Sequence, residues 1–125
     1  MLFDTDVLIW FLRGHPRAAT LVDRAADRSV SVVTYMELLQ GARNKQEIKT
    51  IKSFLTEFAF RVVPLTENIG HRALVYIEEY ALKAGMSMAD ALIAATAVEN
   101  HLALLTANQK HYKAISDLEI KVFKP

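Results

Sequence analysis

Apolar residues along this chain follow two spacings. Short runs rich in Val, Ile, Leu and Phe alternate with longer segments in which apolar residues recur every three or four positions, as they do on one face of a helix. We expect strands near residues 1–4, 29–33, 60–64, 102–106 and 119–123. We expect helices over 7–13, 16–27, 35–43, 45–58, 67–84 and 88–100, with a further one over 109–115. Repeated strand-then-helix units predict an α/β fold in which helices cover a parallel sheet.

Two predicted helices have a hydroxyl residue three positions before an acid near their start. Thr34 precedes Glu37, and Ser87 precedes Asp90. This spacing is that of a capping box, in which the hydroxyl and the acid each bond a backbone amide of the first helical turn. Taken singly, Glu37 and Asp90 are therefore explained as capping residues.

Composition limits the chain to few classes of protein. Its 125 residues are 52% hydrophobic and 23% charged, which is typical of one globular domain, so we expect a single domain over 1–125. The absence of cysteine excludes disulfide frameworks, thiolate zinc sites and cysteine nucleophiles. A formal net charge of +1 gives no broad basic field, so any contact with nucleic acid must be local.

The N-terminal segment does not have the pattern of a signal peptide. Asp4 and Asp6 stand where a basic segment would be required. Charged residues interrupt every apolar stretch well before the roughly 20 residues that a membrane span needs. We expect a cytoplasmic protein with no membrane association.

The same two acids are the first candidates for chemistry. Asp4 and Asp6 interrupt an otherwise apolar N-terminus, which is unfavourable unless they are solvated, paired or bound to a ligand. For Asp6, capping of a helix that begins near Val7 is the simpler explanation, and Thr5 is an alternative cap. For Asp4, which ends the first predicted strand, capping is the weaker explanation.

Three acids are expected at one edge of the sheet. Asp4 ends the first strand, Glu37 begins the helix after the second, and Asp90 begins the helix that leads into the fourth. In open parallel sheets, ligands bind at the carboxyl ends of the strands. Three carboxylates there would repel one another, and a divalent cation that prefers oxygen ligands is the natural neutraliser.

Four blocks of sequence extend this argument. They are Asp4–Ile9, Val32–Gly41, Met88–Ala97 and Leu104–Tyr112. In this order and at these separations they resemble the conserved blocks of PIN domains, and the resemblance runs nearly from end to end. It implies a three-layer α/β/α PIN-like fold whose central parallel sheet has four to five strands.

Within that family, the short length and the Glu-Leu-Leu-Gln-Gly run resemble the VapC toxins of toxin–antitoxin pairs. The resemblance implies a Mg²⁺- or Mn²⁺-dependent endoribonuclease, a homodimer held inactive by a cognate VapB-like antitoxin. It assigns Asp4, Glu37 and Asp90 as the catalytic, metal-binding acids. Asn108 stands where many relatives have a fourth acid, which leaves one or two metal ions as alternatives.

Neighbouring polar residues are candidates for supporting roles. Thr5, Asp6, Thr106 and Asn108 are candidates to bind a metal-coordinated water or the substrate. For Thr106, strand propensity and local turn bonding explain the residue equally well.

Four basic residues are candidates for contacts with RNA phosphates. They are Arg13, Arg43, Lys45 and Lys110. An ordinary solvated surface is the alternative explanation for each. Trp10, Phe11 and Met36 are expected to be buried, or else to line a groove that accepts an antitoxin helix.

Three other functions remain alternatives. A non-catalytic PIN-like interaction module would use the same acids only as helix caps, and a PIN nuclease could act in RNA processing outside a toxin–antitoxin pair. A receiver-like or phosphatase-like domain would need another functional Asp or Lys after a later strand, where the sequence has Val33-Thr34 and Pro64-Leu65. The sequence does not indicate which RNA is cleaved or where.

Overall fold

The computed structural model describes all 125 residues, and its strands form one parallel sheet. The strands are β1 (Leu2–Phe3), β2 (Ser29–Ser31), β3 (Arg61–Val63), β4 (Leu104–Thr106) and β5 (Ile120–Val122). Their order across the sheet is β3-β2-β1-β4-β5, and every neighbouring pair is parallel. The predicted parallel sheet is confirmed, with each strand shorter than the apolar run that indicated it.

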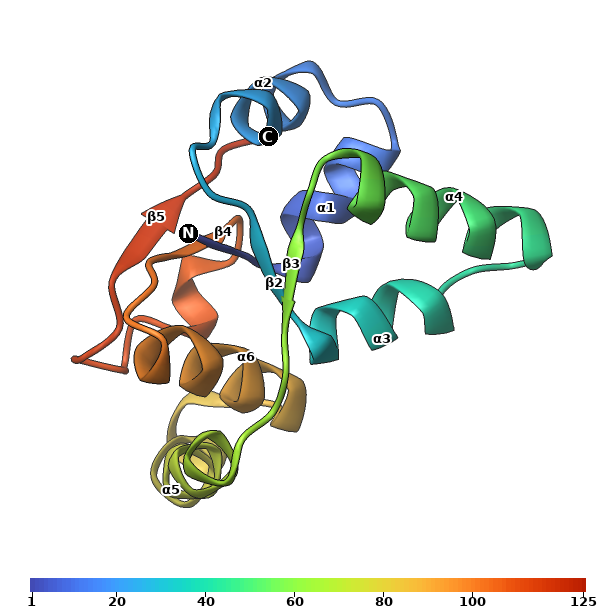
Figure 1. Cartoon of the computed structure of the whole chain (residues 1–125). Coiled ribbons are helices and arrows are strands. Elements are labelled where there is room, and N and C mark those ends of the chain that lie inside the picture. The colour runs from blue at the N-terminus through green and yellow to red at the C-terminus, as the bar shows by residue number, and fades with distance from the viewer.

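Helices cover both faces of this sheet (Figure 1). They are α1 (Thr5–Leu12), α2 (Pro16–Arg24), α3 (Val32–Gln40), α4 (Lys45–Glu57), α5 (Glu67–Ala84) and α6 (Met88–Glu99), followed by the 3₁₀-helix η1 (Gln109–His111). Helices α5 and α6 pack against one face, and α1, α2 and α4 pack against the other. The fold is therefore the predicted three-layer α/β/α arrangement.

Two apolar cores lie between these layers because successive strand residues point to opposite faces of a sheet. Leu2 and Leu104 face the core beneath α5 and α6, whereas Phe3 and Leu105 face the core beneath α1, α2 and α4. All four side chains are almost completely buried. The alternation fixes the register of β1 and its neighbour β4.

Helix α3 starts earlier than predicted. It begins at Val32, three residues before the predicted start, and Ser31 caps it by accepting a hydrogen bond from the Val33 N–H at 3.0 Å. The predicted cap, Thr34, is buried inside the helix. The prediction was wrong because two β-branched valines favour a strand, whereas Ser31 ends the strand and offers its hydroxyl to the helix.

The cap of α1 also differs from the prediction. Asp4 is the N-cap, with its carboxylate accepting from the Thr5 N–H, so neither Thr5 nor Asp6 caps this helix. The expectation that capping explains Asp4 least well was wrong. The helix predicted over 109–115 is reduced to the single turn η1.

Helix α5 has the predicted bounds because local signals mark both ends. Thr66 accepts a hydrogen bond from the Ile69 N–H at 3.2 Å, and Gly85 ends the helix in the left-handed conformation with φ of 66°. None of the helices combines the length and the apolar character needed to cross a membrane.

Candidate active site

Asp4 is a buried acid at the end of the central strand β1. Only 6% of the surface of Asp4 is exposed. Oδ1 accepts from the Thr5 N–H and Oδ2 accepts from the Thr106 hydroxyl, both at 2.8 Å. Burial, and then the charge of Asp6, raise the pKa of Asp4 to about 7, although hydrogen bonds from Thr106, Thr5 and Tyr112 act to lower it. With this pKa and no further positive group, the protonated and ionised forms of Asp4 are about equally populated at neutral pH.

Asp6 lies beside it with one carboxylate oxygen satisfied and the other not. Oδ2 accepts from the Ala107 N–H and from Asn108 Nδ2, both at 3.0 Å, and lies 3.4 Å from the Thr106 hydroxyl. Oδ1 is buried and has no hydrogen-bond partner. Burial raises the pKa of Asp6 and outweighs the hydrogen bonds that lower it. A buried carboxylate oxygen without a donor is a position that a cation or an ordered water would satisfy.

Glu37 reaches this edge of the sheet from α3. Its Oε1 accepts a 2.7 Å hydrogen bond from the Thr5 hydroxyl, which itself lies 3.0 Å from the hydroxyl of Thr34. Because α3 begins at Val32, Glu37 lies in the second helical turn and does not form the predicted capping box. Its carboxylate is instead directed to the start of α1, next to Asp4.

Asp90 lies in the first turn of α6. Its own N–H donates to Ser87 Oγ at 3.1 Å, which confirms Ser87 as the N-cap. The carboxylate does not return to the backbone of Ser87. Instead, Oδ1 accepts from the Tyr112 hydroxyl at 3.1 Å, and Oδ2 lies 3.5 Å from Nδ1 of the half-exposed His111. Only half of the predicted capping box is therefore formed.

Tyr112 is the site residue to which sequence reasoning gave no role. Its side chain is completely buried. Burial, followed by the charges of Asp4 and Asp90, raises its pKa far above the usual 10, so the hydroxyl remains a proton donor at all relevant pH values. The sequence feature that could have indicated this role is the position of the tyrosine at the end of the fourth block. A tyrosine buried there would be expected to have a partner for its hydroxyl.

The supporting residues link Asp4, Asp6 and Glu37 through hydrogen bonds. Thr5 bonds both Asp4 and Glu37, and Thr106 lies against Asp4 and Asp6. Asn108 bonds Asp6 through its side chain and Thr106 through its backbone N–H at 3.0 Å. The structure thus places the four candidate supporting residues among the acids.

The chemistry of the site fits a divalent cation with oxygen ligands. Every acid carries oxygen donors, and the buried Oδ1 of Asp6 has no partner. In the side-chain arrangement of this structure, no three Asp, Glu or His side chains are placed to hold one ion together. Instead, Asp4, Glu37 and Asp90 each accept a hydrogen bond from a neutral hydroxyl group at one carboxylate oxygen.

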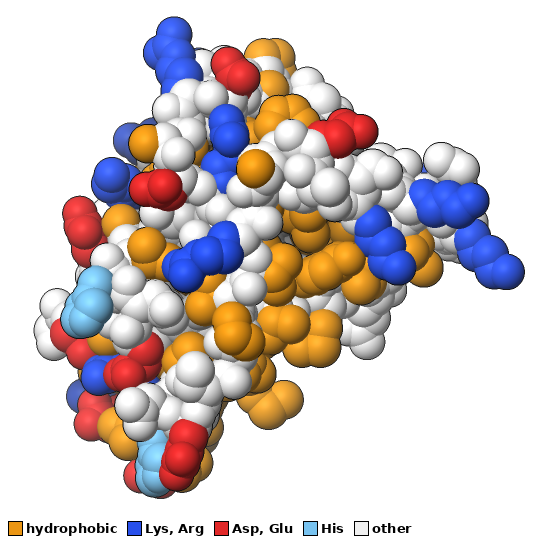
Figure 2. Space-filling view, viewed as in Figure 1, with side chains coloured by type: hydrophobic (Ala, Val, Ile, Leu, Met, Phe, Trp, Pro, Cys, Tyr) orange, Lys and Arg blue, Asp and Glu red, His pale blue; other side chains and the backbone are white.

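A groove extends from Glu37 between α1, α3 and α4. It has a volume of about 520 Å³, and its lining includes Ile9, Arg13 and Arg43. Arg13 is exposed, whereas Arg43 forms a 2.8 Å ion pair with Glu47, so its charge is partly neutralised. Lys and Arg side chains gather at the outer end of the α3–α4 hairpin, where α4 begins with the exposed Lys45 (Figure 2).

Lys110 is next in sequence to His111, which lies beside Asp90. It is an exposed residue of η1, immediately before His111 and Tyr112. Its position near the acids is compatible with a phosphate contact.

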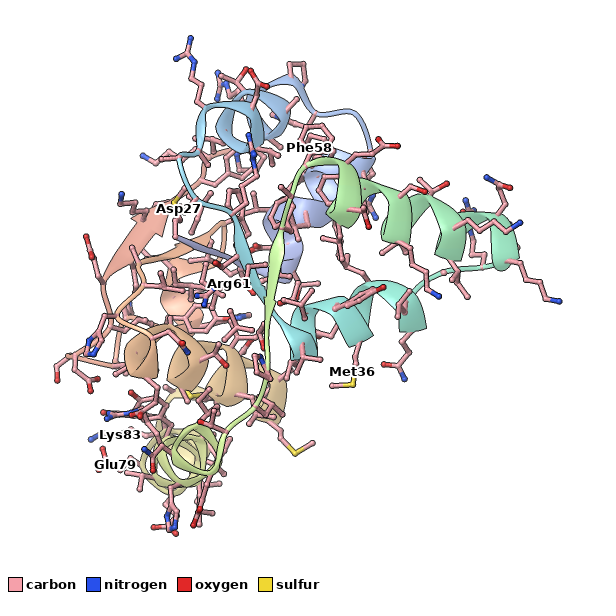
Figure 3. The ribbon with its side chains drawn as sticks, in the orientation of Figure 1. Asp27, Met36, Phe58, Arg61, Glu79 and Lys83 are labelled. Carbon is pink, nitrogen blue, oxygen red and sulfur yellow. The ribbon has the colours of Figure 1, made fainter.

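The three large apolar residues expected to be buried or to line a groove differ in burial, and none of them lines the groove beside Glu37. Phe11 stacks on Phe54 with ring centroids 4.6 Å apart, and the part-buried Trp10 contacts His15 edge to face. Met36 is 53% exposed and points away from α3 into open space (Figure 3). The expected burial is therefore partly confirmed for Phe11, whereas the expectation that Met36 is buried was wrong.

A family model and curated relatives both match this chain over most of its length. Residues 1–116 match the family model described as PIN domain. Ribonuclease VapC10 of Mycobacterium tuberculosis is 35% identical over 123 residues, which cover 95% of this chain and 90% of that protein. Ribonuclease VapC19 of the same organism is 32% identical over 126 residues, covering 94% and 96%.

Solved structures agree with this comparison. A chain of a toxin–antitoxin complex from Klebsiella pneumoniae is 26% identical and superimposes with a TM-score of 0.78, covering 94% of this chain and 93% of that one. Since a family model matches nearly the whole chain and two relatives exceed 30% identity over almost all of it, the protein belongs to the PIN domain family.

Proposed function

We propose that this protein is a metal-dependent endoribonuclease that acts as the toxin of a toxin–antitoxin pair. The observation that supports the chemistry is the pair of neighbouring acids Asp4, which is buried, and Asp6, which is part-buried and has a buried oxygen without a partner. Two carboxylates in a poorly solvated site favour a bound cation. The similarity to ribonucleases VapC10 and VapC19 supports RNA as the substrate.

Asp4, Glu37 and Asp90 are the proposed ligands of Mg²⁺ or Mn²⁺, with Asp6 beside them. When bound, such an ion supplies Lewis-acid activation of a water for attack on a phosphodiester and offsets negative charge on the phosphate oxygens. Thr5 and Thr106 hold Glu37 and Asp4 in position through their hydroxyls. With an ion bound, the hydrogen bonds from these two threonines would still hold one oxygen of each carboxylate in a fixed orientation.

The groove beside Glu37 is the proposed path for the RNA strand. Arg13 and Arg43 line it, and Lys45 lies at the start of α4, so phosphates on either side of the scissile bond would meet positive charge. Lys110, which precedes His111 beside Asp90, would contact a further phosphate. Base contacts are not needed for this positioning, because phosphate contacts fix register without reading sequence.

A cognate antitoxin is the proposed protein partner. The support is the toxin–antitoxin complex that this chain resembles over nearly its full length. A homodimer is also expected for the active protein. Size-exclusion chromatography with light scattering, performed with and without a co-expressed candidate antitoxin, would measure both associations.

The test of catalysis compares isosteric variants of acids. Purified Asp4→Asn and Asp90→Asn proteins are expected to lose RNA cleavage while their circular dichroism remains that of the native fold. Asp27→Asn is the matched control, because Asp27 is exposed and precedes β2, at the opposite edge of the sheet. Full cleavage by either site variant would reject the assignment, as would an equal loss in the Asp27 variant.

A further inference from the structure

The Tyr112 hydroxyl contacts the acidic site from inside the apolar core. The tyrosine follows η1 directly, yet it is completely buried and belongs to the core beneath α5 and α6. A phenylalanine would fill the same space with the same ring. The hydroxyl is therefore not required for packing, and its role must lie in its contacts.

Those contacts are made to a carboxylate that is otherwise loosely held. Tyr112 donates to Asp90 Oδ1 at 3.1 Å, whereas Oδ2 has only His111 Nδ1 at 3.5 Å. Ser87 fixes the backbone of Asp90 but does not contact its carboxylate. The phenol is thus the group that sets the orientation of Asp90, with Oδ1 turned to the core and Oδ2 turned outward.

The same hydroxyl also affects the acid at the end of β1. A hydrogen bond from Tyr112 lowers the pKa of Asp4, and the charges of Asp4 and Asp90 both raise the pKa of Tyr112. The hydrogen bond of this hydroxyl goes to Asp90 in α6, and the charge of Asp4, which follows β1, acts on the same group. Because it has one hydrogen, it donates to one acid at a time.

We propose that Tyr112 is a positioning residue that orients Asp90 next to Asp4 for binding of a divalent cation. The proposal rests on the proposed function, since it concerns the same ion. Hydrogen bonds to ligating carboxylates fix their geometry, and their removal typically reduces metal affinity 10- to 100-fold. The competing explanation, that Tyr112 only fills the core, predicts no change in affinity when Phe replaces it.

The test is a Mn²⁺ titration of EDTA-treated protein by calorimetry. Tyr112→Phe is expected to weaken Mn²⁺ binding at least about tenfold. Tyr76→Phe is the matched control, because Tyr76 is 6% exposed, lies in the same core and has its hydroxyl 3.3 Å from Asp117 Oδ1. The control is expected to bind Mn²⁺ as the wild type does.

A kinetic measurement separates positioning from a general structural role. The Mn²⁺ concentration for half-maximal RNA cleavage is expected to rise in Tyr112→Phe by the same factor as the dissociation constant. At saturating Mn²⁺, the rate is expected to return to near the wild-type value, because Asp90 itself is retained. A rate loss that saturating Mn²⁺ does not restore would contradict the proposal.

A measurement on the wild-type protein does not depend on folding of the variant. In protein labelled with ¹³C at the tyrosine ring, Mg²⁺ is expected to shift the Tyr112 resonances and leave those of Tyr76 in place. Unshifted Tyr112 resonances, or equal affinity of Tyr112→Phe and wild type, would overturn the inference alone. Absence of Mn²⁺ binding by the wild type would overturn the proposed function and the inference with it.

Discussion

Replacing Asp4 by Asn is expected to stabilise the metal-free protein at neutral and alkaline pH. The side chain has the same shape, and Asn can still accept from the Thr5 N–H through its oxygen while donating to the Thr106 hydroxyl. What the substitution removes is the charge of an acid that is 6% exposed and next to Asp6. The folded state of the variant therefore does not contain the buried negative charge that destabilises the wild type.

The magnitude follows from the pKa of Asp4, which burial and Asp6 raise from 3.8 to about 7. One pKa unit is equivalent to about 1.4 kcal/mol. Ionisation of Asp4 therefore costs about 4 kcal/mol more in the folded protein than in the unfolded chain. Because the pKa is raised on folding, stability is greatest below pH 4, falls as pH rises toward 7, and is level above it. The Asn variant lacks the part of this decline that Asp4 causes.

The assay is urea unfolding of both proteins in EDTA at several pH values. The stability of Asp4→Asn relative to wild type is expected to increase by about 3 kcal/mol between pH 5 and pH 8. Adding Mn²⁺ at pH 8 is expected to stabilise the wild type and to have much less effect on the variant. A stability difference that does not change with pH in EDTA would refute the argument that buried charge destabilises this site.

Two further changes test parts of the fold away from the acids. Arg72→Met is expected to destabilise the protein by about 1–2 kcal/mol in urea unfolding, because it leaves Glu99 and Asp117 without their part-exposed ion pairs. RNA cleavage should persist, since Glu99 ends α6 whereas Asp90 begins it, and a loss of cleavage in a folded variant would contradict this separation. Gly85→Ala is expected to lower stability by about 1 kcal/mol through backbone strain alone, because φ is 66° and nothing lies within 4 Å of the added methyl. An unchanged melting temperature would show that α5 ends differently.

The sequence predicted elements whose signals are local. Helix α5 matched because Thr66 and Gly85 mark its ends by chemistry that acts within one turn. The start of α3 did not match, because the role of Ser31 depends on where β2 stops pairing with its neighbours. The two valines that follow Ser31 are equally compatible with a strand and with a helix until that boundary is known.

The same distinction applies to the site. Asp4, Glu37 and Asp90 were expected at one edge because parallel strands end together, and the structure places them there. Their roles as metal ligands stay a prediction. Tyr112 received no role because its partner Asp90 lies 22 residues away, and sequence spacing does not reveal such a contact. The expected helix over 109–115 also gave no reason for Tyr112 to face the acids.

The unpartnered oxygen of Asp6 was likewise invisible in the sequence. Capping was the simpler explanation for Asp6, yet Asp4 takes that role and Asp6 turns toward Ala107 and Asn108. The outcome depends on β4 lying directly beside β1, which brings Ala107 within hydrogen-bond distance of Asp6. Only the tertiary pairing of these strands determines it.

We propose that this edge of the sheet hydrolyses RNA with a metal-activated water. The most direct measurement is cleavage of end-labelled RNA by the purified protein in EDTA and after addition of Mn²⁺, with identification of the new RNA ends. No cleavage is expected in EDTA, whereas cleavage is expected with Mn²⁺. The products are expected to lack a 2′,3′-cyclic phosphate, because water rather than the ribose 2′-hydroxyl attacks phosphorus. Cleavage in EDTA that leaves a cyclic phosphate would contradict it.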